Sequence, residues 1–157
     1  MNGHVSRTPG GARTGSRQRI AGPLARSAYP LARSAYPLPA APESVRRARA
    51  WVRITLTAQG HHDELDTALL IMSELASNAV IHATGPAVIK IVCELDAETL
   101  TLGVIDYGEG QPRLVNAAGN DERGRGLRLV DALCQEWGCH PCDGGKIVFA
   151  RLKVTRP

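Results

Sequence analysis

Residues 65–81 form a long apolar run with the pattern of a helix that is hydrophobic on most of its sides. Such a helix is expected to be buried. Glu74 and Asn78 nevertheless fall within it, and their spacing of four residues places them on one helix face, one turn apart. A buried carboxylate or amide without a partner costs roughly 2–7 kcal/mol, so both side chains need one.

The Glu74–Asn78 pair has three interpretations. It is a structural hydrogen-bonded pair, a polar stripe that faces solvent, or a stripe that faces a metal ion and a nucleotide. In the third case Glu74 is a base and the Asn78 amide oxygen is a ligand for a hard cation. For the pair alone a structural role is the more frequent one, so the choice depends on the rest of the chain.

Shorter patterns predict further helices around this run. Pro42, Glu43 and Ser44 form a start signal for a helix that Gly60 closes. Asp63 is expected to cap the long helix, which ends near the Gly-Pro at residues 85–86. A further helix is expected over residues 124–135, after a glycine-rich loop.

Alternating apolar and polar positions predict two hairpins. The first joins residues 87–95 to residues 99–106, and the second joins 136–142 to 146–154 through an Asp-Gly-Gly turn. The order is helix, helix, hairpin, loop, helix, hairpin. It predicts an α+β fold, a two-layer α/β sandwich with helices on one face of a mixed, mostly antiparallel sheet.

The first 36 residues differ from the rest of the chain. They are rich in Gly, Arg, Ser, Pro and Ala, and PLARSAY occurs twice in tandem, at residues 23–29 and 30–36. A proline every seven residues forbids a continuous helix. We therefore expect a disordered arm over residues 1–36 and one domain over residues 37–157.

Charge and hydropathy narrow the classes of function. The formal net charge is +4, and much of the positive charge lies in the first fifty residues, so the remaining body is close to neutral or slightly acidic. This distribution argues against a nucleic-acid-binding domain. No apolar run has the roughly 18–20 residues of a membrane span, and no signal-peptide core is visible, so a cytoplasmic protein without membrane contact is expected.

Cys139 and Cys142 have the C-x-x-C spacing of zinc and redox sites. A zinc site needs two further ligands, and only Cys134 and His140 are near in the sequence. Free thiols in a reducing cytoplasm are the favoured interpretation, with a metal or redox protein as a minor alternative.

Two glycine motifs lie where ligands often bind. Asp106, Gly108 and Gly110 form D-x-G-x-G directly after a predicted strand, where the glycines permit close approach of a ligand or another backbone. Gly124 and Gly126 belong to a G-x-G-L segment at a predicted helix start, where free N–H groups and the helix dipole favour anions. Each motif alone is also typical of an ordinary turn.

Together, E-x-x-x-N on the long helix, D-x-G-x-G after a strand and G-x-G-L at a helix start form an ordered set. On these motifs the chain resembles the ATP-binding domain of the gyrase and histidine-kinase type superfamily, the Bergerat fold. The resemblance covers roughly residues 37–154. Within the superfamily it is closest to the anti-sigma-factor serine/threonine kinases of actinobacterial type.

The resemblance implies a role for each motif residue. Glu74 would be the catalytic general base, and Asn78 would hold Mg²⁺. Asp106 would read the amino group of adenine, while Gly108 and Gly110 would let the chain pass beside the base and ribose. Residues 111–123 would form a lid over the nucleotide.

The remaining implied residues surround the phosphates. Gly124, Gly126 and the N–H groups leading to Leu127 would hold phosphate, and Arg123 or Arg125 would neutralise the transferring charge. His82, one turn beyond Asn78, would line the pocket, with a core histidine as the alternative.

The function that the resemblance implies is a protein kinase with ATP and Mg²⁺ as cofactors. Its substrate would be a Ser or Thr of an anti-sigma-factor antagonist with a STAS domain, and it would also sequester a sigma factor. Relatives commonly dimerise, so a homodimer is compatible with the resemblance. The alternative is a nucleotide-dependent binding module without kinase activity.

Three features depart from the family pattern. Arg128 replaces a glycine that often follows the G-x-G-L segment, where it either crowds the lid or lies on the helix surface. Lys146 follows Gly145 where the family often has Gly-Thr, so no hydroxyl is offered on the adenine side. The first strand is hard to see, and a sheet of four clear strands with a ragged edge is expected.

Overall fold

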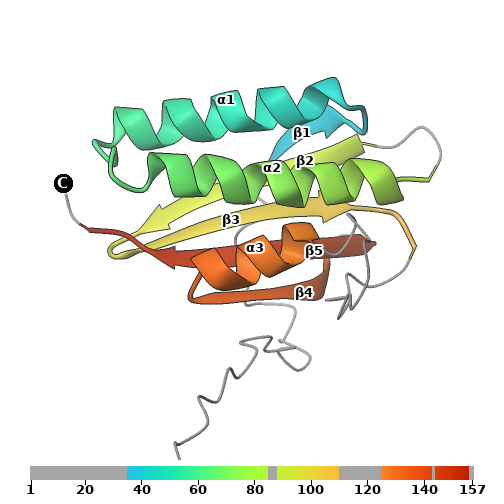
Figure 1. Ribbon diagram of the computed structural model, residues 1–157. Helices are drawn as coiled ribbons and strands as arrows, with labels where there is room; N and C mark the ends of the chain where they lie inside the picture. The colour runs from blue at the N-terminus through green and yellow to red at the C-terminus, as the bar shows by residue number, and fades with distance from the viewer. Residues whose placement is uncertain (1–34, 85–87, 110–124, 143, 156–157) are drawn as a thin grey trace, which may run out of the picture.

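The structure is a computed structural model that describes residues 35–84, 88–109, 125–142 and 144–155. In these residues three helices lie on one face of a sheet of five strands (Figure 1). The helices are α1 (Glu43–Ala58), α2 (Leu65–His82) and α3 (Arg125–Leu133). The strands are β1 (Tyr36–Pro39), β2 (Val88–Asp96), β3 (Thr99–Asp106), β4 (Glu136–Cys142) and β5 (Gly145–Lys153).

The sheet has the strand order β1-β2-β3-β5-β4. Each of the four pairings between described strands is antiparallel. The two predicted hairpins, β2–β3 and β4–β5, are present, and they join through β3 and β5 in the middle of the sheet. The two-layer α+β sandwich expected from the sequence is confirmed.

The sheet also has a short first strand at the edge where the sequence showed none clearly. In β1, Tyr36 pairs with Ile91 and Leu38 pairs with Ile89. Leu38 is buried, and the Tyr36 ring stacks on Trp51 of α1 at 5.7 Å between centroids. Prolines are tolerated because an edge strand does not need every N–H for a ladder. The expected boundary between arm and domain thus falls within β1, because Tyr36, assigned to the disordered arm, begins that strand. Residues 1–34 of the predicted arm lie outside the described residues.

The tandem repeat gives the chain a second copy of the β1 sequence. Residues 28–31 and 35–38 both read Ala-Tyr-Pro-Leu, so on sequence we expect Leu31 to be able to replace Leu38 in the core position. Using it lengthens the connection to α1 from residues 40–42 to residues 33–42, at a cost of about 1 kcal/mol. We expect Leu38→Asp, which buries a charge, to cost several kcal/mol when residues 23–34, and with them Leu31, are deleted and markedly less in the full chain. Urea unfolding of both variants tests this, and equal losses would contradict it.

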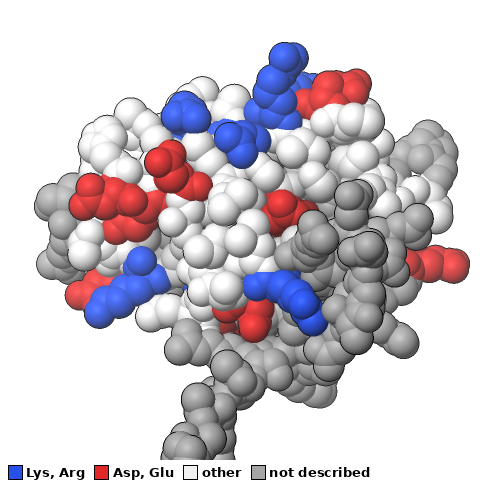
Figure 2. All heavy atoms as spheres, viewed as in Figure 1, with Lys and Arg blue, Asp and Glu red and all other residues white. Residues whose placement is uncertain are grey.

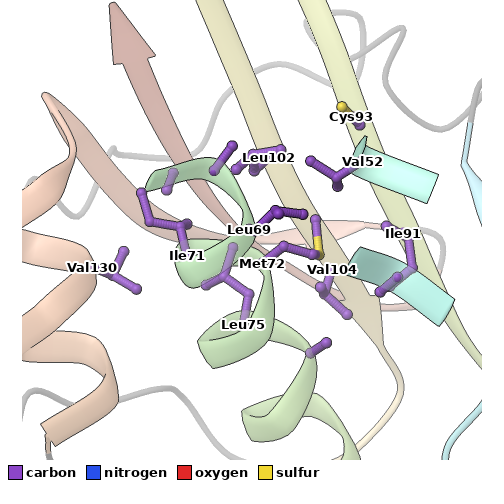
Figure 3. Packing of buried hydrophobic residues seen from close by; sticks show 14 of the residues in the cluster. Val52, Leu69, Ile71, Met72, Leu75, Ile91, Cys93, Leu102, Val104 and Val130 are labelled. Carbon is purple, nitrogen blue, oxygen red and sulfur yellow. The ribbon is translucent and has the colours of Figure 1, made fainter. Parts of the chain in front are cut away.

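The main core lies between the helices and the sheet. In α1 the buried residues recur every fourth position, at Ser44, Ala48, Val52 and Leu56, which forms one stripe toward the sheet. Figure 3 shows Val52 of α1 and Leu69 and Met72 of α2 among side chains from β2, β3 and α3. This single cluster fixes α2 between the sheet and the two other helices.

Two expectations about α2 need correction. The helix packs against the sheet, α1 and α3 but is not buried all round, because Leu70 is 39% exposed and Ile81 is 67% exposed on a face open to solvent. Asp63 is not its cap either: α2 begins at Leu65 without a side-chain cap bond. The neighbouring Glu64 carboxylate accepts from the N–H (2.8 Å) and the hydroxyl (2.9 Å) of Thr155, and the Thr155 N–H is the main cause of the lowered pKa of Glu64.

The sheet face opposite the helices carries a smaller buried cluster of Val92, Ile105, Ile147 and Phe149. His140 stacks on Phe149 at 5.1 Å and is 4% exposed. Burial lowers the pKa of His140, the positive charge of Arg151 lowers it further, and Glu136 acts in the opposite direction. The folded state therefore favours neutral His140.

This burial predicts a pH dependence of stability. A lowered pKa means that the unfolded state binds more protons, so stability is complete above the ordinary value of 6.5 and falls as the pH decreases below it. We expect His140→Gln to flatten this slope in urea unfolding at about pH 7.5 and about pH 5.5. His62→Gln, at an exposed position, is the control and should keep the slope. An unchanged slope in His140→Gln would refute the assignment.

Acidic and basic side chains are interspersed over the described part of the helical face, without a continuous basic area (Figure 2). No helix among the described residues combines the length and the apolar character that a membrane span requires.

Candidate functional site

The motif residues meet at one end of the helical face. Glu74, Asn78 and His82 follow one another along α2, Asp106 ends β3, and Gly126 lies in the first turn of α3. The first residues of β5 are hydrogen-bonded neighbours of the end of β3. Four elements that are distant in the sequence therefore contribute to one site.

The Glu74 carboxylate lies against the start of α3. A Cβ atom placed on Gly126 would overlap Glu74 Oε2, so only glycine leaves room for the carboxylate there. Both Glu74 and Asn78 are half-buried, and among the described residues neither has a hydrogen-bond or ion-pair partner. Glu74 and Asn78 are therefore not bonded to each other or to another described residue, which is compatible with a carboxylate and an amide that face a ligand.

The first turn of α3 supplies donors beside Glu74. The first N–H groups of a helix have no partner within it, and they lie at the positive end of the helix dipole. The Leu127 side chain is 4% exposed and belongs to the core, so only its backbone N–H is available to a ligand. Arg128 is exposed, which makes it part of the helix surface.

Gly108 brings the end of β3 against the last turn of α2. A Cβ atom on Gly108 would overlap the carbonyl oxygen of His82, so this close approach requires glycine. The His82 residue is exposed, which rules out the alternative of a core histidine. The segment after Asp106 is thereby fixed beside the helix that carries Glu74 and Asn78.

Asp106 is the most buried charged group of the site, at 3% exposure. Its Oδ1 atom accepts from the Gly108 N–H at 3.0 Å and from Lys146 Nζ at 2.7 Å. The Lys146 ammonium also donates to the Gly108 carbonyl at 2.8 Å. Sequence reasoning noted the missing hydroxyl at this position but missed the ion pair, which depends on the pairing of Asp106 with Lys146 across two strands.

Several predicted site residues lie outside the described residues: Gly110, Arg123, Gly124 and the lid over residues 111–123. Arg125 begins α3, but its side chain is likewise not described. Their implied roles stay predictions.

The cysteine pair is split between the two faces of β4. Cys139 packs against the main core on the helical face, and Cys142 packs against the smaller cluster on the other face. Side chains three positions apart on a strand point in opposite directions, so the two sulfurs do not converge on one ion. None of the four cysteines, all of them described, forms a disulfide. Burial raises the pKa of Cys139, and it raises the pKa of Cys93 to about 12.

Comparison with known proteins identifies the family. Residues 38–152 match the model of the histidine kinase-like ATPase domain. The chain belongs to this family. No curated protein matches it significantly.

A solved structure shows the same fold. It is the crystal structure of the RsbU and RsbW domains of Rv1364c from Mycobacterium tuberculosis, with 23% sequence identity and a TM-score of 0.54. The match covers 78% of this chain and 33% of that one. The chain thus spans about a third of the length of this neighbour, and the likeness concerns the fold.

ATPase domains of this family bind ATP, typically with Mg²⁺. The described residues fit such a ligand. A half-buried carboxylate and amide without described partners suit a hard cation, and the N–H groups of α3 suit phosphate. The buried carboxylate of Asp106 suits a base with an exocyclic amine.

Proposed function

We propose that the chain is an ATP-dependent protein serine/threonine kinase whose substrate is an anti-sigma-factor antagonist with a STAS domain. The observation that carries this proposal is the position of the Glu74 carboxylate, half-buried and directly against Gly126 at the start of α3. A base beside a phosphate-binding helix start is the arrangement that transfer to a hydroxyl requires.

Each group in the site has one task in this reaction. The N–H groups at the start of α3 bind the phosphates, and Asn78 orients Mg²⁺, which neutralises phosphate charge when bound. Glu74 accepts the proton of the attacking Ser or Thr hydroxyl. Asp106 accepts from the adenine amine at the buried end of the site.

The partner assignment rests on the motifs that this chain shares with anti-sigma-factor kinases, together with the family membership. The fold of a neighbour that contains an RsbW domain is compatible with it. We further propose that the protein is cytoplasmic and sequesters a sigma factor.

The test is transfer of labelled γ-phosphate from ATP to a purified STAS-domain protein, with the target Ser or Thr replaced by Ala as the control. Labelling of the intact substrate alone supports the kinase. Tight ATP binding without transfer to any STAS protein would favour the nucleotide-dependent binding module instead.

A substitution at Gly126 tests whether Glu74 must lie where the structure has it. In Gly126→Ala the new Cβ displaces the end of the Glu74 side chain, which is flexible, so the fold should persist. Alanine is the better helix former by about 0.5–1 kcal/mol, so the melting temperature should not fall. We expect phosphate transfer to decrease at least tenfold in single-turnover assays.

The matched control for this substitution is Arg128→Ala, on the exposed side of the same helix. It should leave both the transfer rate and the melting temperature close to the wild-type values. Normal transfer by folded Gly126→Ala would show that the contact between Glu74 and α3 is not needed for the reaction.

A further inference from the structure

The ion pair between Lys146 and Asp106 lies at the end of the proposed nucleotide site where adenine would bind. The two residues are directly opposite each other on β5 and β3. Their side chains are 13% and 4% exposed, so the pair is shielded from water on most sides. Because the ammonium bridges Asp106 Oδ1 and the Gly108 carbonyl, at 2.7 Å and 2.8 Å, its position is fixed by two charge-assisted bonds.

Both partners keep unused hydrogen-bonding capacity. An ammonium group has three N–H donors, and the described residues use two of those of Lys146. Among the described residues, the bonds to the Asp106 carboxylate both end on Oδ1, and none is recorded to Oδ2. Among the described residues, one N–H of Lys146 and the Oδ2 atom of Asp106 thus have no recorded partner, and both belong to the same ion pair at the end of β3.

We propose that Lys146 is a specificity-determining residue that donates its third N–H to N1 of adenine, while Asp106 Oδ2 accepts from the 6-amino group. This inference rests on the proposed ATP binding and specifies how the base is read. The Watson–Crick edge of adenine presents an amine donor beside the N1 acceptor, which complements an acceptor beside a donor.

The ammonium group of Lys146 should discriminate between adenine and other purine bases more strongly than a hydroxyl group would. A hydroxyl group donates or accepts, whereas an ammonium group only donates. Guanine and hypoxanthine carry an N–H at position 1 and a carbonyl at position 6, so in this orientation both of their groups oppose the protein groups. A mismatched buried donor or acceptor is costly, and the site should therefore reject GTP and ITP.

The first test changes the ligand and leaves the protein intact. Calorimetric titration of the wild-type protein compares ATP with 1-deaza-ATP, which has a C–H in place of N1, and with 7-deaza-ATP as the control. We expect 1-deaza-ATP to bind at least tenfold more weakly than ATP and 7-deaza-ATP to bind within about threefold of ATP. GTP and ITP should bind at least a hundredfold more weakly.

The second test assigns the effect to Lys146. In Lys146→Met the penalty for 1-deaza-ATP relative to ATP should shrink to within about threefold, because the donor to N1 is gone. Since this variant leaves the Asp106 carboxylate buried without its counter-ion, Lys146→Gln, which keeps a neutral donor, is measured beside it. Circular dichroism confirms that each variant is folded before titration.

The outcomes separate this inference from the proposed function. Equal binding of ATP and 1-deaza-ATP to the wild-type protein would overturn the role of Lys146 while leaving ATP binding intact. GTP binding as tight as ATP binding would likewise overturn it, because the pair would then read guanine. Absence of binding of any nucleotide would overturn the proposed function and this inference with it.

Discussion

Replacing Asp106 by asparagine should weaken ATP binding by at least tenfold, or about 1.4 kcal/mol. The carboxylate is 3% exposed and already accepts two hydrogen bonds on Oδ1, so Oδ2 is the acceptor left for the adenine amine. An asparagine amide has one acceptor oxygen and one NH₂ donor group, so if its oxygen accepts from Gly108 and Lys146, its NH₂ group faces the adenine amine. It cannot satisfy Gly108, Lys146 and an amine together, and calorimetric titration with Mg²⁺-ATP measures the loss.

The same substitution also removes the counter-ion of Lys146, so loss of folding must be separated from loss of binding. Breaking a buried ion pair by removing one partner costs about 3–5 kcal/mol, and this pair is partly shielded. Titrations are therefore made well below the melting temperature of the variant. Asp96→Asn, at an exposed carboxylate at the end of β2, is the control. Unchanged affinity in folded Asp106→Asn would reject Asp106 as the reader of the base.

The elements that the sequence predicts correctly are those specified by local pattern. In β3 the core residues Leu100, Leu102 and Val104 occupy every second position, because one face of the strand packs on the main core. In β5 the residues from Ile147 to Ala150 are all apolar, because one face packs on the main core and the other forms the cluster around Phe149. The stripe of α1 has a period of four because only one face meets the sheet. Such periodicity is readable in any short window of the chain.

The features that the sequence does not reveal depend on contacts between distant segments. β1 contains two prolines in four residues and is a strand because β2 offers its edge and the core accepts Leu38. Glu64, and not the expected Asp63, precedes the first residue of α2, and its carboxylate accepts from Thr155, far along the chain, instead of capping the helix. No local propensity contains this information.

The candidate site likewise has features that the sequence predicts and features that depend on contacts between distant segments. The motifs name Glu74, Asn78 and Asp106, because residue type and spacing carry the chemistry. They do not reveal that the Glu74 carboxylate fits only because Gly126 has no side chain. Nor do they reveal that Lys146 donates a hydrogen bond to one oxygen of Asp106. Those contacts appear only when β5 and α3 are placed beside β3 and α2.

Glu74→Gln should lower the rate of phosphate transfer by roughly 10²–10⁴-fold and leave ATP affinity unchanged. A general base acts mainly in the transition state, where it takes the hydroxyl proton, and a neutral amide oxygen is too weak a base to do so. Glutamine also keeps the shape of the side chain against Gly126, whereas alanine would leave a hole beside α3. Single-turnover transfer to the STAS-domain substrate and ATP titration are measured on the same preparation.

Asn78→Ala is the matched comparison on the same face of α2, and it should have the opposite profile. A metal ligand acts on the bound ground state, so this substitution should weaken Mg²⁺-ATP binding, and its effect should diminish when ATP is titrated without Mg²⁺. The two half-buried side chains lack described partners, so neither substitution breaks a recorded hydrogen bond.

The combination of the two profiles decides what the polar stripe of α2 does. If Glu74 is only structural, the glutamine variant should lose stability and keep its transfer rate per folded molecule. If Glu74 and Asn78 both act on binding alone, the two variants should weaken ATP affinity together. One outcome assigns the general base to Glu74 and the metal ligand to Asn78: Glu74→Gln binds ATP tightly but transfers phosphate slowly, and Asn78→Ala binds Mg²⁺-ATP weakly. Only in that outcome is an effect on the transition state separated from an effect on the ground state.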